Sequence, residues 1–202
     1  MKSLQGNVHK KTSEFWSWFK ERSSELAAGD IPEGLIEELE ARLFAIHKLD
    51  WEIGPGRNAA NLFALSPTGD EELLKLTRAV IAEAPDLPDW EFCPAKPPRN
   101  WDLVFSLTVD DASIEIDGKL WEFVAYKFKD GTYDLILKPD STKGLSDDYL
   151  NWAAMIIADG ELGEETRMEL VQDLEVVRTW EAKVAPSAKK LQPGLLAKLL
   201  RP

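Results

Sequence analysis

The sequence predicts an α+β fold in which mainly antiparallel sheets carry helices packed on one face. Segments that alternate apolar and polar residues, as strands do, lie between segments whose apolar residues recur at helical spacing. The order hairpin, helix, strand occurs twice, over residues 49–96 and 120–177. This repetition predicts a duplicated hairpin-helix-strand unit, built either as two sheets or as one continuous antiparallel sheet.

A pair of N-terminal helices is predicted over residues 1–48, packed on the body of the protein. The first covers residues 13–28, where large aromatic residues recur at near-helical spacing until Gly29 ends the pattern. The second covers residues 32–47, because Pro32 suits a first helical position and glutamates follow it near the positive end of the helix dipole.

The first hairpin-helix-strand unit is predicted over residues 49–98. Its hairpin turns at the glycine-proline-glycine run of residues 54–56. Thr68 and Glu71 stand in capping-box relation, so a helix is expected to start there. A strand follows at residues 90–94, and the prolines after it place this strand at an edge or an end of the sheet.

The second sheet-helix unit is predicted over residues 99–202. Alternating strands occupy residues 103–126, and the aspartate-glycine dipeptide at 130–131 is a strong hairpin signal before the next strand. Ser146 is placed to cap a helix that Gly160 would end. A short helix closes the chain, and we expect all three segments to form one compact domain with a basic C-terminal tail.

The segment of residues 166–177 fits two patterns. Alternate apolar residues indicate a strand, whereas helical spacing fits almost as well. We interpret the segment as a strand, which completes the second hairpin-helix-strand order. The strand set is Met168, Leu170, Leu174 and Val176, and the helix set is Leu170, Val171, Leu174 and Val177.

The charge of the chain limits its partners. The 202 residues include 24 Lys and Arg against 36 Asp and Glu, which gives a formal charge of −12. Residues 1–177 sum to −17, and the basic tail after them either folds back on this acidic body or touches an anionic surface. Because nucleic-acid affinity comes mainly from Lys and Arg, binding of DNA or RNA is not expected.

The composition points to a cytoplasmic protein without a cofactor. No stretch approaches the roughly 18 apolar residues of a membrane-spanning helix, and the first residues lack the apolar core of a signal peptide. Cys93 is the single cysteine, which fits a reducing compartment. His9 and His47 lie on unlike segments, and no glycine loop suits a phosphate, so neither a nucleophilic hydrolase nor a dinucleotide site is expected.

Four short segments carry a resemblance to known proteins. They are residues 51–54, 65–69, 84–90 and 162–164, which read WEIG, LSPTG, APDLPDW and LGE. With these turn and core residues the chain resembles bacterial proteins of an uncharacterised family, and some similar domains belong to immunity proteins that neutralise toxins. The similarity covers about residues 49–177 and supports the predicted fold more than any activity.

Carboxylates around a predicted tight turn are the main candidates for chemistry. Hard oxygen ligands of this kind suit Ca²⁺ or Mg²⁺. The run lacks the sixth-position glycine of a calcium-binding loop, so solvated turn acids are the favoured interpretation and a metal site or a carboxylate enzyme is the alternative. The candidate metal ligands are Asp110, Asp111, Glu115 and Asp117, and a second acidic group is Asp159, Glu161, Glu164 and Glu165.

Three large rings form a candidate protein-binding patch. Trp16 departs from the helical stripe of its aromatic neighbours, and Trp121 and Phe123 lie on a predicted sheet face. Tryptophan anchors are typical of protein-binding surfaces. The alternative, which the average burial of tryptophan favours, places all eight tryptophans in the core.

These patterns favour a non-enzymatic interaction protein of the toxin-immunity kind, whose negative surface attracts a basic protein partner. Two alternatives stay open. An enzyme or metal-binding protein would use one of the carboxylate groups. A structural subunit would use exposed aromatic residues to close a homodimer.

Overall fold

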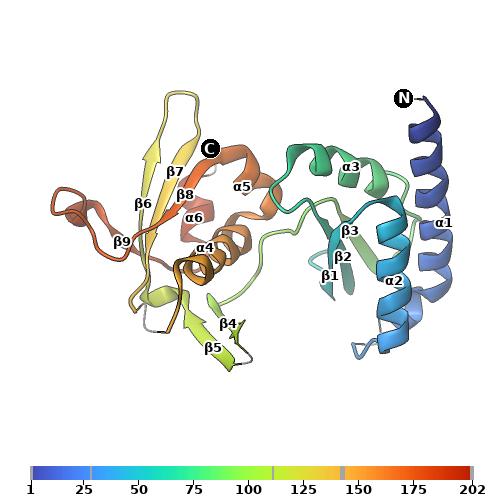
Figure 1. Ribbon diagram of the computed structural model, residues 1–202, viewed down its shortest axis with the longest axis horizontal. Coiled ribbons are helices and arrows are strands. Elements are labelled where there is room, and N and C mark those ends of the chain that lie inside the picture. The colour runs from blue at the N-terminus through green and yellow to red at the C-terminus, as the bar shows by residue number, and fades with distance from the viewer. Residues whose placement is uncertain (1, 28, 111, 142–143, 201–202) are drawn as a thin grey trace. The chain divides into compact units, whose positions relative to one another are not determined.

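The computed structural model divides the chain into two compact units, residues 1–96 and 97–202 (Figure 1). It describes residues 2–27, 29–110, 112–141 and 144–200. The division between these units lies close to the boundary expected at residue 98. Each unit combines helices with a sheet, and antiparallel strand pairs outnumber parallel pairs in the described part of the chain, so the α+β prediction is confirmed.

The N-terminal unit contains a three-stranded sheet and three helices. Its elements are α1 (Lys2–Leu26), α2 (Glu33–Ile46), β1 (Asp50–Pro55), β2 (Asn61–Ser66), α3 (Glu71–Ile81) and β3 (Trp90–Cys93). The strand order is β1-β2-β3. A short loop makes β1 and β2 antiparallel, whereas β3 is parallel to β2 because α3 carries the chain back between them.

The core of this unit is aromatic, and α1 supplies several of its rings. Phe15 and Phe19 are buried against Phe63 of β2, with ring centroids 5.9 and 5.0 Å from that of Phe63. Trp16 is only 4% exposed, and its indole N–H donates a hydrogen bond of 2.7 Å to the Val80 carbonyl oxygen. Trp16 is therefore a core residue, as the favoured interpretation has it, because α3 as well as the sheet covers α1.

Helix α3 begins at a cap that differs from the expected one. Asp70 is the N-cap, and its Oδ1 accepts hydrogen bonds from the backbone N–H groups of Glu72 and Leu73 at 2.7 and 3.1 Å. Thr68 lies in the preceding turn with a φ of 50°. The capping box expected between Thr68 and Glu71 is therefore wrong, because the N-cap is Asp70, two residues after Thr68. The helix itself is confirmed.

The C-terminal unit contains a separate hairpin and a four-stranded sheet. Its elements are β4 (Val104–Val109), β5 (Ala112–Asp117), η1 (Gly118–Leu120), β6 (Glu122–Lys127), β7 (Tyr133–Lys138), α4 (Asp147–Leu162), α5 (Glu164–Leu170), β8 (Val171–Val176), η2 (Ala185–Ser187), β9 (Lys189–Lys190) and α6 (Leu195–Leu200). The sheet has the strand order β8-β7-β6-β9. Leu135 and Leu137 of β7 share one core with Ala153 and Ile157 of α4, so this helix covers the inner face of the sheet.

The segment of residues 166–177 is partly helix and partly strand. Met168 and Leu170 belong to α5, and β8 begins at Val171. The strand prediction is therefore confirmed for the second half of the segment and wrong for the first. Helix α4 also continues past the expected stop at Gly160 and ends at Gly163, whose φ of 81° suits glycine.

The predicted duplication is present in the topology. The chain follows the same path in both units. In the N-terminal unit the path is β1, β2, α3 and β3. In the C-terminal unit it is β6, β7, α4 with α5, and β8. Each copy is an antiparallel hairpin, a helical crossover and a third strand parallel to the second. In each copy the third strand lies at an edge of its sheet.

Candidate protein-docking site

The three rings of the candidate binding patch lie in the core, the alternative that the sequence favours for tryptophan. Trp16, Trp121 and Phe123 are 4%, 4% and 2% exposed. Trp121 and Phe123 belong to the hydrophobic core of the C-terminal unit, and Trp16 belongs to that of the N-terminal unit. Because hydrophobic contacts surround all three, they supply no exposed patch. Exposed aromatic rings in the described part of the chain are Phe44, Tyr126, Phe128 and Trp152.

The acids of the candidate metal site are spread along one hairpin. Asp110 lies at its turn, whereas Asp117 lies at the far end of β5, where its carboxylate accepts the Lys119 N–H at 3.0 Å and caps η1. Glu115 is exposed between them, and Asp111 lies outside the described residues. A strand of this length spans about 20 Å. Within the residues that the structure describes, no three His, Cys, Asp or Glu side chains are grouped to hold a metal ion.

The second acidic group has structural partners. Glu161 is 3% exposed, and its Oε1 accepts the Gly194 N–H at 3.0 Å, just before α6. Asp159 Oδ1 accepts a hydrogen bond of 2.8 Å from Arg167 Nε, which links α4 to α5. These carboxylates therefore fix neighbouring helices in place.

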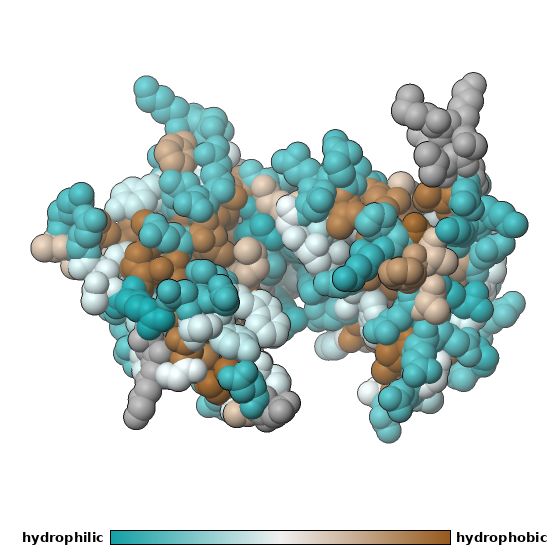
Figure 2. Space-filling view, in the orientation of Figure 1, coloured by the Kyte–Doolittle hydropathy of each residue, from teal (hydrophilic) through white to brown (hydrophobic). Residues whose placement is uncertain are grey.

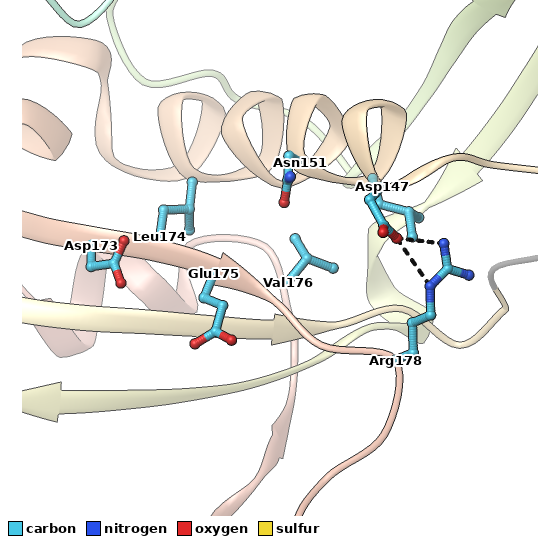
Figure 3. A pocket seen from close by; sticks show the side chains of 8 residues that line it. Asp147, Asn151, Asp173, Leu174, Glu175, Val176 and Arg178 are labelled. Atoms are coloured by element: carbon cyan, nitrogen blue, oxygen red, sulfur yellow. Dashed lines mark hydrogen bonds and ion pairs between the residues drawn. The ribbon is translucent and has the colours of Figure 1, made fainter.

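A groove between β8 and the first turns of α4 is the candidate docking site (Figure 3). We call it the β8 groove. It has a volume of about 360 Å³ and opens to solvent. Helix α4 contributes Asp147, Leu150 and Asn151, and the opposite side is formed by residues 173–176 and Arg178.

The groove follows the free edge of the sheet, because β8 is its outermost strand. On the inner side, the Val177 N–H donates to the Leu137 carbonyl oxygen of β7 at 2.9 Å. Successive residues of a strand direct their backbone groups to opposite sides. Leu174 and Val176 therefore direct their N–H and C=O groups away from β7, toward the place that a further strand would occupy.

The two sides of β8 differ in chemistry. Leu174 and Val176 lie on the side that faces α4, and Glu175 points to the opposite side (Figure 3). Asp173 shares the side of Glu175, and both carboxylates are exposed. Asp134 of β7 is in register with Asp173 and adds a third carboxylate to that side. The edge is thus apolar toward the helix and acidic on the other face.

An ion pair lies at one end of the groove. Arg178 donates from Nε and Nη2 to Asp147 Oδ1 at 3.0 and 2.6 Å. This pair neutralises Asp147, but no ion pair with Asp173 or Glu175 occurs among the described residues. The groove therefore keeps an unbalanced negative charge.

Sequence reasoning missed this groove, although its residues carry one usable signal. Residues 173–176 alternate acidic and apolar side chains, a pattern typical of a strand with one buried and one solvated face. Charged residues on such a strand are common at sheet edges, where they discourage unwanted pairing. The pattern does not reveal that Leu150 and Asn151 of α4 lie across from it.

Comparisons with protein-family models, with curated proteins and with solved structures find no match for this chain. No helix within the described ranges is long and apolar enough to span a membrane. Figure 2 shows hydrophilic side chains over most of the visible face, with apolar side chains in smaller patches between them. The geometry and the charge of the β8 groove are therefore the basis for assigning a function.

Proposed function

We propose that the protein is a non-enzymatic interaction module that binds a basic protein partner, as toxin-neutralising immunity proteins do. The β8 groove carries this proposal. It combines an open sheet edge, apolar side chains on the helix side and two exposed carboxylates that form no ion pair among the described residues. A basic partner would supply the missing cations.

The overall charge supports the same class of partner. At −12 the chain repels acidic proteins and attracts basic ones, which raises the rate of encounter before any contact forms. The groove then provides a local surface where an encounter is converted into a bound state. The single cysteine fits a cytoplasmic site of action.

Coexpression with the proteins encoded beside this chain's gene tests the proposal. We expect one of them to be basic, to arrest growth when expressed alone and to lose its toxicity when this chain is present. The two proteins should copurify at low salt, and their affinity should fall as the salt concentration rises, because salt screens attraction between opposite charges.

Two results would overturn the proposal. One is that none of the neighbouring gene products binds this chain at low salt. The other is that a partner binds with an affinity that does not change between low and physiological salt, which would mean that the negative charge has no part in binding. A matched control is a partner whose lysines are acetylated, which should bind less tightly than the unmodified protein.

A further inference from the structure

We infer that the β8 groove binds its partner by strand addition, taking up an extended segment in which apolar residues alternate with lysine or arginine. The inference rests on the proposed function and specifies its mode of recognition. In strand addition, an extended segment joins a sheet through main-chain hydrogen bonds, and alternate side chains give specificity.

The backbone of β8 provides the first argument. Leu174 and Val176 direct their N–H and C=O groups outward, so each has one donor and one acceptor for a neighbouring strand. The groove occupies the space beside these groups. The six residues of β8 span about 20 Å, which is enough to pair with an extended segment of about six residues.

The side chains on the helix side provide the second argument. Leu174 and Val176 are only partly buried, although both pack against the core of the unit. Leu150 of α4 lines the same groove. Leu150 is already buried, whereas apolar side chains of an added strand would cover Leu174 and Val176 and remove their surface from water, which favours association. Every second residue of the bound segment is therefore apolar.

The carboxylates on the other side provide the third argument. Asp173 and Asp134 occupy paired positions on adjacent strands, where like charges destabilise a sheet. Glu175 extends this negative row along the edge. A cationic side chain on an added strand would lie beside these acids and relieve their repulsion. The remaining residues of the bound segment are therefore Lys or Arg.

The same charges argue against a second copy of this chain as the occupant. If two β8 edges paired with each other, Asp173 and Glu175 of one copy would lie beside the same acids of the other. Acidic residues on edge strands oppose such self-pairing. The free edge of β8 thus favours pairing with a basic segment and disfavours pairing with β8 of a second copy of this chain.

A seven-residue peptide tests the inference with the full-length protein. The probe alternates Val and Arg, begins and ends with Val, and is acetylated and amidated to remove its terminal charges. We expect calorimetry to detect binding in low salt. A peptide with the same residues in blocks, four Val followed by three Arg, keeps the charge but loses the alternation, and it should bind about tenfold more weakly or less.

Substitution of the two acids tests the assigned surface. The double variant Asp173→Asn with Glu175→Gln should bind the alternating peptide about tenfold more weakly, because two favourable charge interactions are lost. The double variant Asp110→Asn with Glu115→Gln removes two exposed carboxylates from the β4–β5 hairpin, outside the groove, and should leave the affinity within about twofold of the original. An equal loss in both variants would mean that net charge alone attracts the peptide, which overturns the inference.

N-methylated peptides test the main-chain hydrogen bonds. In one peptide the Val nitrogens are methylated, and in another the Arg nitrogens are methylated. An added antiparallel strand would turn its Val N–H groups toward β8, whereas a parallel strand would turn its Arg N–H groups there. We expect one of the two peptides to lose about tenfold or more in affinity and the other to keep it.

The outcomes separate the mode of binding from the function. Equal affinity of the two N-methylated peptides, or a shift of the protein to a dimer in place of peptide binding, overturns strand addition. A neighbour-encoded partner that still binds in a salt-dependent way then leaves the proposed function standing. Loss of both peptide binding and partner binding overturns the two together.

Discussion

A single methyl group at position 160 would collide with a tryptophan ring. A Cβ atom on Gly160 would lie 2.4 Å from Cζ2 of Trp101, well inside van der Waals contact. The ring has little freedom to retreat, because it packs against Phe105 with ring centroids 5.8 Å apart and its N–H donates to Glu161 at 3.4 Å. We expect Gly160→Ala to destabilise the C-terminal unit by about 1–3 kcal/mol, measured by calorimetric unfolding.

The matched control is the same substitution in a helix with open space around it. A Cβ atom on Gly34 of α2 would meet no atom within 4 Å. Gly34→Ala should therefore stabilise the N-terminal unit by up to about 1 kcal/mol, since alanine favours helix over glycine. If Gly160→Ala also raised the melting temperature, the close packing of Trp101 against α4 would be contradicted.

A residue-level prediction can succeed where the partner is close along the chain, although the capping box expected between Thr68 and Glu71 does not form. Ser146 is the expected cap of α4, and its side chain accepts the Tyr149 N–H three residues on. Trp16 is different, because its partner Val80 is 64 positions away. The burial of Trp16 depends on where α3 packs, and helical spacing within α1 does not contain that information.

At the scale of elements, the local pattern identifies most strands and helices but not their neighbours. The alternation of residues 171–176 indicates a strand, but α5 precedes it without a break in the apolar pattern, so the start of β8 is not visible in the sequence. The polar start of the chain also hides the first turns of α1. The β8 groove was not predictable, because α4 and β8 are placed side by side only by packing on β7.

The segment after β8 is tied to the sheet by Glu122 of β6. Its Oε2 accepts the Trp180 indole N–H at 2.8 Å and lies 3.2 Å from Lys138 Nζ. The bond from Trp180, followed by that from Lys138, lowers the pKa of Glu122 from its ordinary value of 4.5. Because the folded pKa lies below the unfolded one, this carboxylate stabilises the fold above pH 4.5, and the stabilisation is lost as the pH falls through the lowered folded value.

Glu122→Gln should therefore reduce the acid sensitivity of the C-terminal unit. At neutral pH we expect a loss of less than about 1 kcal/mol in stability, because solvent screens part of the interaction. Between neutral pH and about pH 3 the variant should lose less stability than the original protein, as measured by urea unfolding at each pH. Glu115→Gln is the control and should retain the original pH dependence. The same acid sensitivity in both variants would contradict the role of Glu122.

At the scale of the whole molecule, the repeated order of elements and a boundary near residue 98 were predictable, whereas a separate core in each half was not. The spacing of apolar residues predicts a hairpin, a helix and a strand in each half, and the structure contains both copies. Whether two sheets share one core depends on which apolar faces meet, and a strand pattern is the same in either case. The proline-rich stretch at residues 94–98 is the one local feature that coincides with the division.

Each unit has a hydrophobic core of its own. The N-terminal core and the residues packed against it lie between Val8 and Phe92, and the C-terminal core with its packed residues lies between Trp101 and Leu200. No residue belongs to both sets. A domain folds alone when its core closes within its own residues. We therefore expect residues 1–96 and 97–202, expressed separately, each to unfold in one cooperative transition.

Calorimetry of the two fragments and near-ultraviolet circular dichroism of their tryptophans measure this directly, since each unit contains several of these residues. Each fragment should melt near one of the transitions of the full chain. The fragment 97–202 should also bind the alternating Val and Arg peptide, because every residue of the β8 groove lies within it. If a fragment shows no cooperative transition, its core needs the other unit in order to fold. That result would contradict the expectation that each unit folds alone.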